Sequence, residues 1–262
     1  MNIIVLIKQV PDTTDVKIDQ KTGTLIREGV PSIINPDDKH AIEEALRLRE
    51  KLGGKVTVLS MGPPQALDAL REAKAMGTDD NILLSDRAFA GADTWATSYT
   101  LATAIKKIGE FDLIICGRQA IDGDTAQVGP QIAECLGLPQ ITYVRKIEIE
   151  GKTVKAERTL EDGFERIETS LPVLITVIKD LNKPRYPSVK GIVEACRDAE
   201  FPIWTAKDIG ADPKKIGLDG SPTQVKRSFA PKPHGEGVML KGTVEEMTKE
   251  LVSKLKDDNV VG

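Results

Sequence analysis

The chain has 262 residues and a mass of 28.5 kDa, enough for one large domain or for a domain with a substantial extension. Hydrophobic residues make up 40% of it and charged residues 29%, which excludes a disordered chain. The formal net charge of −4 and the 4% of aromatic residues disfavour a nucleic-acid binder, which should be basic overall or on one face.

The cysteines and the apolar runs bear on the compartment. Cys116, Cys135 and Cys196 are widely spaced and form no CxxC pair, which is typical of reduced intracellular thiols. The first residues have no basic stretch before their short apolar run and do not resemble a signal peptide. Because no apolar run approaches the roughly 20 residues that span a bilayer, we expect a cytoplasmic protein with no membrane partner.

The first elements are set by an apolar run and by a helix start. Residues 2–10 are continuously apolar in their middle and predict a central strand that is buried on both faces. Residues 16–19 and 25–28 flank a turn at 21–23 and predict a small hairpin. Asn35 then precedes Pro36 and two acidic residues, so we expect Asn35 to cap a helix that stops at Gly53, and the cap alone accounts for residues 35–38.

Strands and helices then alternate along the chain. Strands are predicted at 55–61, 81–85 and 112–116, and helices at 63–76, 93–108 and 127–136. This alternation predicts an α/β fold with a doubly wound parallel sheet. Residues 141–150, 153–158, 164–169 and 173–178 are predicted to form four strands with short turns, arranged as an antiparallel meander at the edge of the sheet.

The last third of the chain has a different character. Residues 183–187 are expected to be extended by their prolines, and 189–197 to form a short helix. Residues 204–242 have little periodicity, and 243–256 predict an amphipathic helix capped by Thr243. Such a tail cannot form its own core. It must pack on a partner subunit or on its own domain, and the pattern alone leaves both open.

Ligands of a doubly wound sheet bind outside the carboxyl ends of its strands. No GxGxxG, P-loop, GxSxG or HExxH motif is present, which disfavours the usual dinucleotide, nucleoside-triphosphate and hydrolase sites. The loop at 117–130 is rich in small and polar residues before a helix, and its amides, with Arg118, Thr125 and Gln127, suit a phosphate. The alternative is a plain connection whose Asp and Gly residues form turns. No acid, base or nucleophile stands out, which favours a binding or electron-handling role.

Several strings occur together in a specific order. They are IKQVPD at 7–12, NPDD at 35–38 with AIEEA at 41–45, SMGP at 60–63, GRQAID at 117–122, RTLEDGFERIETSLPVLIT at 158–176 and KPRYPS at 183–188. In this order the sequence resembles the beta subunit of electron-transfer flavoproteins over essentially its whole length. The resemblance implies a Rossmann-like, adenine-nucleotide-binding fold and a heterodimer with an alpha subunit that holds one FAD in a mobile domain. The beta subunit binds AMP in simple members, and in electron-bifurcating members it binds a second FAD that accepts hydride from NADH.

Two departures from the simple members favour FAD. Simple members tend to have an Asp-Asp-Asp run followed by Asn-Gln-Thr, where this sequence reads DGDTAQV at 122–128. The small Gly123 and Ala126 would leave room for a diphosphate. Thr13 stands where simple members often carry an aromatic residue near the alpha-subunit flavin. Together with the KQVPDT and DGDTAQVGP strings, this resembles the bifurcating group, so we expect FAD, with AMP as the alternative.

The resemblance also implies site residues, and it implies no metal and no catalytic side chain, since the redox chemistry belongs to the cofactor. Cofactor contacts are expected from Leu6, Asn35, Asp38, Met61, Gly117, Arg118, Gln119, Ala120, Ile121, Asp122, Gly123, Asp124, Thr125, Ala126, Gln127 and Val128. NADH is expected to approach near Asp86, Phe89, Gly91, Asp93 and Thr94. Tyr186, Val189 and Ile192 are expected to recognise a dehydrogenase, with Val189 as the apolar anchor.

The implied organisation has three parts. Residues 1–182 form the nucleotide-binding domain, 183–200 a dehydrogenase recognition loop, and 201–262 a C-terminal arm and helix that pack on the alpha subunit. Electrons pass from NADH to a flavin-dependent dehydrogenase of the acyl-CoA or hydroxy-acid type and to a low-potential acceptor, ferredoxin or flavodoxin. Two alternatives stay open. One is an AMP-binding carrier that does not bifurcate. The other is a nucleotide-sensing protein of the same fold, for which the meander and the long tail would have no use.

Overall fold

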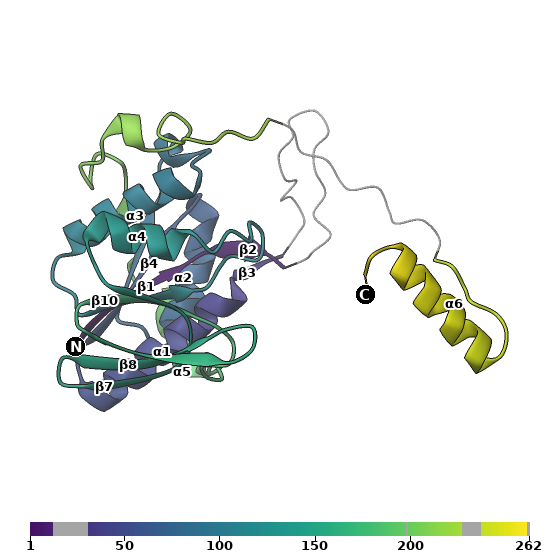
Figure 1. The fold of residues 1–262 in the computed structure, drawn as a ribbon. Coiled ribbons are helices and arrows are strands. Elements are labelled where there is room, and N and C mark those ends of the chain that lie inside the picture. The colour runs from purple at the N-terminus through teal and green to yellow at the C-terminus, as the bar shows by residue number, and fades with distance from the viewer. Residues whose placement is uncertain (13–30, 198, 227–236, 261–262) are drawn as a thin grey trace. The chain divides into compact units, whose positions relative to one another are not determined.

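The computed structural model describes residues 1–12, 31–197, 199–226 and 237–260 (Figure 1). They belong to two compact units, Met1–Lys226 and Arg227–Gly262. The hairpin predicted within 16–28 and the position of Thr13 lie outside the described residues.

A nine-stranded sheet is formed by the described residues of the first unit. Its strands stand in the order β11-β5-β4-β1-β6-β10-β7-β8-β9. Neighbours from β11 to β7 pair in parallel, and β8 and β9 continue the sheet in antiparallel fashion. The strands are β1 (Asn2–Ile7), β4 (Lys55–Met61), β5 (Asp80–Leu84), β6 (Leu113–Gly117), β7 (Gln140–Glu150), β8 (Thr153–Thr159), β9 (Phe164–Ser170), β10 (Val173–Val177) and β11 (Ile203–Trp204). The predicted parallel sheet with an antiparallel edge is confirmed.

Helices cover both faces of the sheet because its central strands are apolar on both sides. On one face Ile3 and Val5 of β1 join the core of α1 (Pro36–Leu52) and α2 (Leu67–Met76), and α5 (Val189–Arg197) packs on α2. On the other face Ile4 and Leu6 pack beneath α3 (Thr94–Ile108) and α4 (Val128–Leu136). Figure 1 shows α3 and α4 on one side of β1 and β4, and α1 on the other.

The chain reverses direction across the sheet next to β1. It runs from β1 outward to β4 and β5, and then returns to the opposite side of β1 as β6. The carboxyl ends of β1 and β6 therefore diverge into connections that leave toward opposite faces, which opens a crevice between them. Short pieces flank these ends: β2 (Gln9–Pro11) pairs with β3 (Ser32–Ile34), and η1 (Pro64–Ala66) and η2 (Arg87–Phe89) follow β4 and β5.

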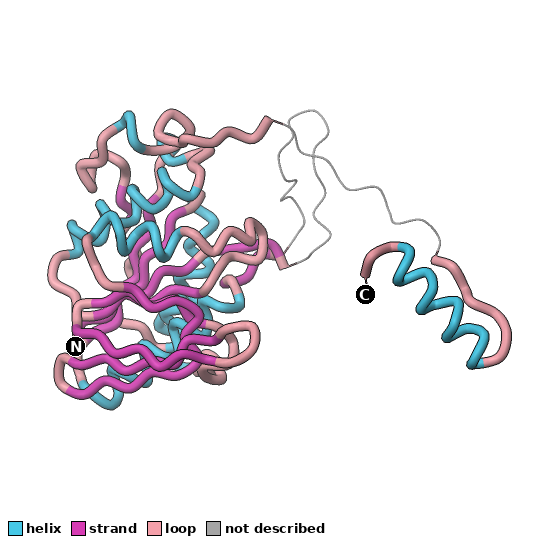
Figure 2. The backbone as a smooth tube through the Cα atoms, viewed as in Figure 1, coloured by secondary structure: helices cyan, strands magenta, loops and turns pink. Residues whose placement is uncertain are grey.

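The predicted four-stranded meander is only partly correct. Strands β7, β8 and β9 form it, with alternating burial, and appear as long magenta segments at the lower edge of the unit in Figure 2. The fourth predicted strand, β10, instead lies between β6 and β7 and is parallel to both. All five residues of β10 are buried. An edge position would expose part of this apolar strand, whereas a position between two neighbouring strands buries it.

The segment after α5 returns to the face covered by α3. Trp204 of β11, Ile209 and Ile216 pack into the core beneath that helix, and η3 (Pro213–Lys215) lies between them. At its end Thr223 donates two hydrogen bonds to Asp93, at the start of α3. This segment therefore belongs to the first compact unit, up to Lys226.

The second unit contains α6 (Val244–Asp257). Thr243 caps this helix as predicted, in a reciprocal pair with Glu246. None of the helix's side chains is buried among the described residues. In the described part of the chain, no helix combines the length and apolar character that a membrane span requires.

Candidate functional site

A cleft of about 950 Å³ lies at the carboxyl ends of β1, β4 and β6, where the chain reverses across the sheet. Its floor is apolar and comprises Leu6, Leu59, Met61, Leu101 and Cys116. Burial raises the pKa of the Cys116 thiol, so this cysteine is an uncharged part of the floor. The walls are the loop after β6, the starts of α3 and α4, and Pro222, Thr223 and Val225.

Asp38 ties two strand ends together at the inner end of the cleft. One carboxylate oxygen accepts from the amide of Lys8, at 2.7 Å, and the other from the amide of Gly117, at 3.0 Å. A Cβ on residue 117 would lie 2.3 Å from the Asp38 oxygen, so only glycine fits there. Burial raises the pKa of Asp38 from 3.8 to about 7, although the two amides favour its charged form.

Asn35 does not cap α1 with its side chain, contrary to the prediction. It is fully buried, its amide nitrogen donates to the carbonyl of Gln119 at 2.8 Å, and its amide oxygen accepts from the N–H of Ile121 at 3.0 Å. A side chain that can satisfy a donor and an acceptor at once suits a loop that turns back on itself. Asn35 therefore shapes the loop after β6 rather than the helix that follows it.

The loop from 118 to 127 adopts an uncommon backbone. Asp124 and Ala126 both have φ of 52°, in the left-handed region that costs energy for residues other than glycine. The next helix, α4, has no side-chain cap, because Gln127 uses its amide oxygen to accept from the Thr94 hydroxyl at 2.9 Å. Val128 and Gly129, the first residues of α4, line the cleft, and no side chain at the cap position accepts from their amides.

Most of the predicted cofactor contacts line this cleft. Among the described residues, those that do are Leu6, Asp38, Met61, Gly117, Arg118, Gln119, Ala120, Gly123, Asp124, Thr125, Ala126, Gln127 and Val128. Asn35, Ile121 and Asp122 lie outside this lining. Asp122 instead pairs with the ammonium of Lys8 at 2.6 Å, which joins the loop after β6 to the end of β1.

Four of the five residues predicted to lie near NADH line the cleft. Phe89, Gly91, Asp93 and Thr94 line the cleft, whereas Asp86 lies outside the described lining. The Asp86 carboxylate accepts from the amides of Ala88 and Ala206. At Asp93, desolvation is outweighed by hydrogen bonds from Ala96 and Thr223, which hold the pKa of the carboxyl below its ordinary value. Asp93 is thus a charged helix cap that also fastens the C-terminal segment.

Sequence reasoning missed part of the lining. Trp95, Thr97, Leu101 and Gln131 come from the inner faces of α3 and α4, and Pro222, Thr223 and Val225 come from the distant segment before residue 227. The helix residues could have been predicted. Helices α3 and α4 start at the cleft, after Asp93 and at Val128, and a helix that starts there turns some residues of its first turns toward the cleft. The C-terminal contacts carry no local signal, because they depend on how 204–226 folds back.

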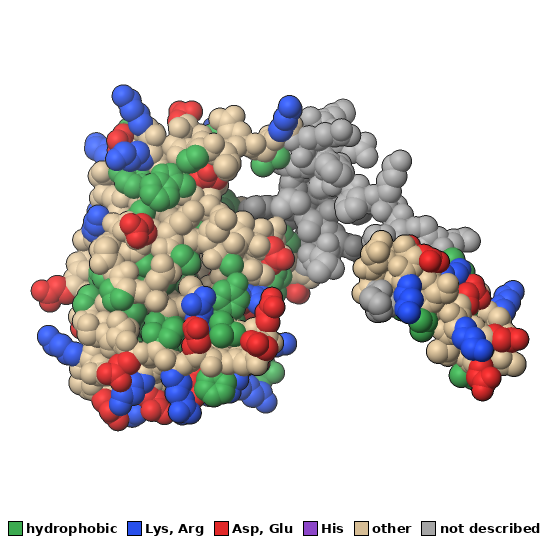
Figure 3. All heavy atoms as spheres, viewed as in Figure 1, with side chains coloured by type: hydrophobic (Ala, Val, Ile, Leu, Met, Phe, Trp, Pro, Cys, Tyr) green, Lys and Arg blue, Asp and Glu red, His purple; other side chains and the backbone are tan. Residues whose placement is uncertain are grey.

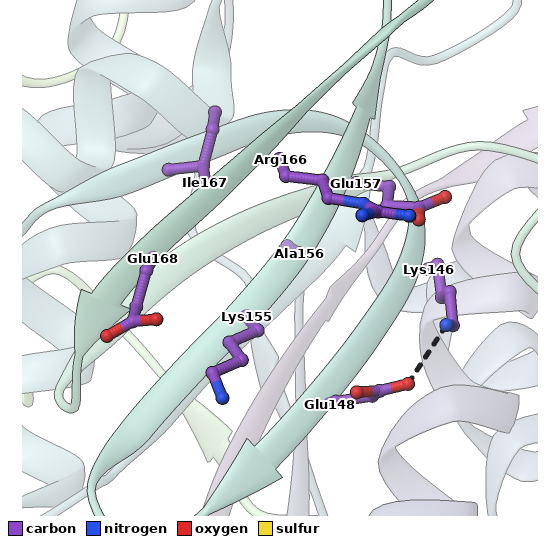
Figure 4. A pocket seen from close by; sticks show the side chains of 8 residues that line it. All are labelled: Lys146, Glu148, Lys155, Ala156, Glu157, Arg166, Ile167 and Glu168. Carbon is purple, nitrogen blue, oxygen red and sulfur yellow. Dashed lines mark hydrogen bonds and ion pairs between the residues drawn. The ribbon is translucent and has the colours of Figure 1, made fainter.

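A second hollow, of about 370 Å³, lies on the outer face of the meander (Figure 4). Oppositely charged residues face each other across its strands: Lys146 opposite Glu157, Glu148 opposite Lys155, and Glu157 opposite Arg166. Figure 4 shows Lys146 joined to Glu148 and Arg166 reaching Glu157, and in Figure 3 red and blue side chains alternate along this lower part of the unit. These charges neutralise one another, which leaves no charge of one sign for a ligand.

The predicted recognition residues stand on an uncovered apolar surface. Tyr186 is 92% exposed, Val189 81% and Ile192 48%. The chain before them is fixed to α1, because Arg185 forms ion pairs with Glu43 at 2.8 Å and with Glu50 at 2.5 Å. Glu43 is buried, and burial opposes its charge, but the bonds from Arg185 hold the pKa of Glu43 below its ordinary value. The surface is thus presented from a rigid base.

The fold and this cleft define a Rossmann-like α/β protein with its ligand crevice at the switch point of the sheet. The electron transfer flavoprotein domain matches residues 22–208. The chain is 60% identical to an electron transfer flavoprotein subunit beta of Thermoanaerobacterium thermosaccharolyticum over 261 residues, covering 100% of both chains. The chain belongs to the electron transfer flavoprotein family, as a beta subunit, which confirms the resemblance.

Two further relatives are named for larger complexes. A subunit of the caffeyl-CoA reductase-Etf complex of Acetobacterium woodii is 57% identical over 263 residues, covering 100% of both chains. The acryloyl-CoA reductase electron transfer subunit gamma of Anaerotignum propionicum is 48% identical over 268 residues, again covering 100% of both. This chain is therefore similar to subunits that are named as parts of reductase systems.

Proposed function

We propose that the cleft binds FAD and that the chain acts with an alpha subunit to take electrons from NADH. The observation that carries this proposal is the cleft itself. Its size suits a dinucleotide, and so does its combination of an apolar floor with a wall of backbone and polar residues. Its volume of about 950 Å³ is near the top of the roughly 300–1,000 Å³ that small-molecule sites span, so AMP would leave much of it unfilled.

The residues of the cleft fit the two ends of such a ligand. Gly117 and Gly129 both lie where a Cβ would collide with neighbouring side chains, within 3.0 Å, which leaves backbone rather than side chain at this wall. The uncapped start of α4 lies at the cleft, and a helix N-terminus suits a diphosphate. Leu6, Met61 and Leu101 form an apolar floor that suits a flat ring system.

The electron route follows from the family resemblance. When bound, FAD supplies an acceptor that takes a hydride and passes its electrons on singly. We propose that each NADH gives up two electrons and a proton. One electron goes through the alpha subunit to a flavin-dependent dehydrogenase of the acyl-CoA or hydroxy-acid type, and the other goes to ferredoxin or flavodoxin. Relatives named for caffeyl-CoA and acryloyl-CoA reductases support an acyl-CoA partner. A cytoplasmic location belongs to the same proposal.

The parts of the chain are assigned to these tasks. Residues 1–182 hold the nucleotide, and NADH approaches the cleft past Phe89, Gly91 and Thr94. Residues 183–200 recognise the dehydrogenase through Tyr186, Val189 and Ile192, which are exposed and apolar. Of residues 201–262, the part up to Lys226 packs on the first unit and adds Pro222, Thr223 and Val225 to the cleft, and the part with helix α6 packs on the alpha subunit. Thr13 is assigned to the neighbourhood of the alpha-subunit flavin.

A simple carrier that binds AMP and does not bifurcate is the second candidate, since AMP is the ligand of simple members of the family. The test is to denature the purified heterodimer and to quantify the nucleotides released. We expect about two FAD per heterodimer and no AMP. About one FAD with one AMP would overturn the proposal in favour of the simple carrier. Release of neither nucleotide would remove both.

A further inference from the structure

Tyr143 of β7 has a backbone conformation that a bulky residue rarely adopts. Its φ is 56°, in the left-handed region where the side chain crowds its own backbone. A strand that only needed this bend would be better served by glycine or asparagine, which tolerate it. The presence of an aromatic residue here therefore requires a reason that lies in the ring.

The neighbouring strands hold this conformation in place. Between Ile175 and Val177 of β10, β7 carries one extra residue, so the ladder is interrupted at Tyr143. Its amide donates instead to the hydroxyl of Thr176, at 3.1 Å, and Thr176 is buried. Such bulges turn a side chain to a new direction and occur beside functional sites.

The ring of Tyr143 lies against Arg118, at the wall of the cleft. The guanidinium carbon of Arg118 is 5.8 Å from the centre of the ring, within the range of a cation–π contact. The Nε atom of Arg118 is 3.6 Å from the Asp37 carboxylate, too far for a hydrogen bond. Among the described residues this buried Nε has no hydrogen-bond partner. The guanidinium is thus held by a ring face and a carboxylate that do not satisfy its donors.

We infer that Tyr143 is a positioning residue that holds the Arg118 guanidinium toward the diphosphate of the nucleotide in the cleft. The inference rests on the proposed function, since it needs a phosphate at that wall. The ring supplies a flat, weakly attractive support, and Asp37 lies beside the buried Nε atom without forming a close ion pair. The terminal amino groups of the partly exposed Arg118 side chain then remain available for an anion.

The test compares phosphate recognition in variants of the purified heterodimer from which nucleotide has been removed. The probes are ADP and adenosine, and the readout is the ratio of their dissociation constants, because a general structural defect would weaken both. Tyr143→Phe keeps the ring, Tyr143→Asn keeps the backbone conformation without a ring, and Tyr143→Leu keeps the bulk without a ring. Arg118→Gln removes the charge, and thermal unfolding checks that each variant is folded.

We expect Tyr143→Phe to keep the wild-type preference for ADP. Tyr143→Asn and Tyr143→Leu should each reduce that preference by about two- to thirtyfold, the range that cation–π contacts span. Arg118→Gln should reduce it at least as much, and Tyr143→Asn should add little in that background. If one ringless variant does not fold, the other decides the matter.

The outcomes separate this inference from the proposed function. An unchanged ADP preference in a folded ringless variant, together with a loss in Arg118→Gln, would overturn the role of Tyr143 and leave that of Arg118 intact. An unchanged preference in Arg118→Gln would overturn the inference as a whole. Failure of the wild-type heterodimer to bind FAD or ADP would instead overturn the proposed function.

Discussion

The side chain of Asn35 connects the start of α1 to the loop that follows β6. Its two hydrogen bonds, with the carbonyl of Gln119 and the N–H of Ile121, are partly buried and shape the loop that forms one wall of the cleft. We predict that Asn35→Ala lowers the free energy of unfolding by about 1–3 kcal/mol, because both of these hydrogen bonds are lost. It should also weaken nucleotide binding, since the loop loses its anchor.

A matched control is available in Asn81, a buried amide at the amino end of β5 that accepts from Thr78. Asn81→Ala should destabilise the protein to a similar degree, as measured by urea unfolding, but should leave the dissociation constant of the nucleotide unchanged. Equal effects of the two substitutions on nucleotide affinity would contradict the assignment of Asn35 to the cleft.

Asp38 makes the stability of the first unit depend on pH. Burial raises its pKa from 3.8 to about 7, so between these values the folded protein keeps a proton that the unfolded chain releases. The free energy of unfolding should therefore fall as pH rises through this window, by at most about 1.4 kcal/mol per pH unit, and this contribution should level off above pH 7.

Urea titrations of the nucleotide-free protein between pH 4 and 8 measure this dependence. Asp38→Asn should remove that slope, with a constant loss because its single acceptor oxygen cannot accept from the amides of both Lys8 and Gly117. Asp68→Asn, on the exposed side of α2, removes a carboxylate elsewhere and serves as the control. A slope that persists in Asp38→Asn would assign the titrating proton to another group.

At the scale of elements, α1 joins the cleft to the exposed apolar surface. Asp38 lies in its first turn, and Glu43 and Glu50 farther along it hold Arg185. Val189, at the start of α5, extends from this base and is the proposed anchor. Buried apolar anchors dominate the energy of interfaces.

We predict that Val189→Asp reduces electron transfer to the dehydrogenase at least tenfold and leaves the nucleotide content unchanged, because a charge at the anchor must be desolvated on docking. Leu160→Asp makes the same change at an exposed apolar residue beside the meander and should have little effect. The measurements are steady-state reduction of the dehydrogenase and released nucleotide. Wild-type transfer by Val189→Asp would show that this surface does not dock it.

Much of the sheet could be predicted from the sequence because apolar runs such as those of β1 and β6 are buried on both faces. The position of β10 could not be derived from turn spacing, which groups it with β7, β8 and β9. Its five consecutive buried residues did contain the signal, since a meander strand such as β8 alternates in burial. Short elements such as β11 and η3 have no periodicity to detect.

The candidate site was predictable where it follows strand ends, as at Leu6, Met61 and Gly117. The site was not predictable where a polar side chain could bond either to its own segment or to a distant one. Asn35 occupies a cap position and yet bonds a loop 84 residues away. The same applies to Thr223, whose contact with Asp93 spans 130 residues. Such contacts depend on tertiary packing, which local pattern does not encode.

At the scale of the whole molecule, α6 is an amphipathic helix whose apolar face is not covered by the described residues of its own unit. Val244, Leu251 and Val252 lie on this face. The capping box at Thr243 fixes where the helix starts. This is the arrangement expected of a helix that packs on the alpha subunit.

We predict that Leu251→Asp weakens association with the alpha subunit by about tenfold or more, because it places a charge in an apolar interface. Ser253→Asp adds the same charge two residues away, on a different side of the helix, and should have little effect. Sedimentation velocity across a dilution series of the heterodimer measures both. Wild-type association of Leu251→Asp would place the contact elsewhere on the chain.

The insertion of β10 between β6 and β7 has a consequence for the order of folding. The chain must pass through α4 and the three strands of the meander before β10 can occupy its position beside β6. During synthesis on the ribosome, β6 therefore emerges with one side unpaired and waits for residues 173–177. We expect this distant pairing to slow folding and to leave an exposed strand edge open to aggregation in the nascent chain.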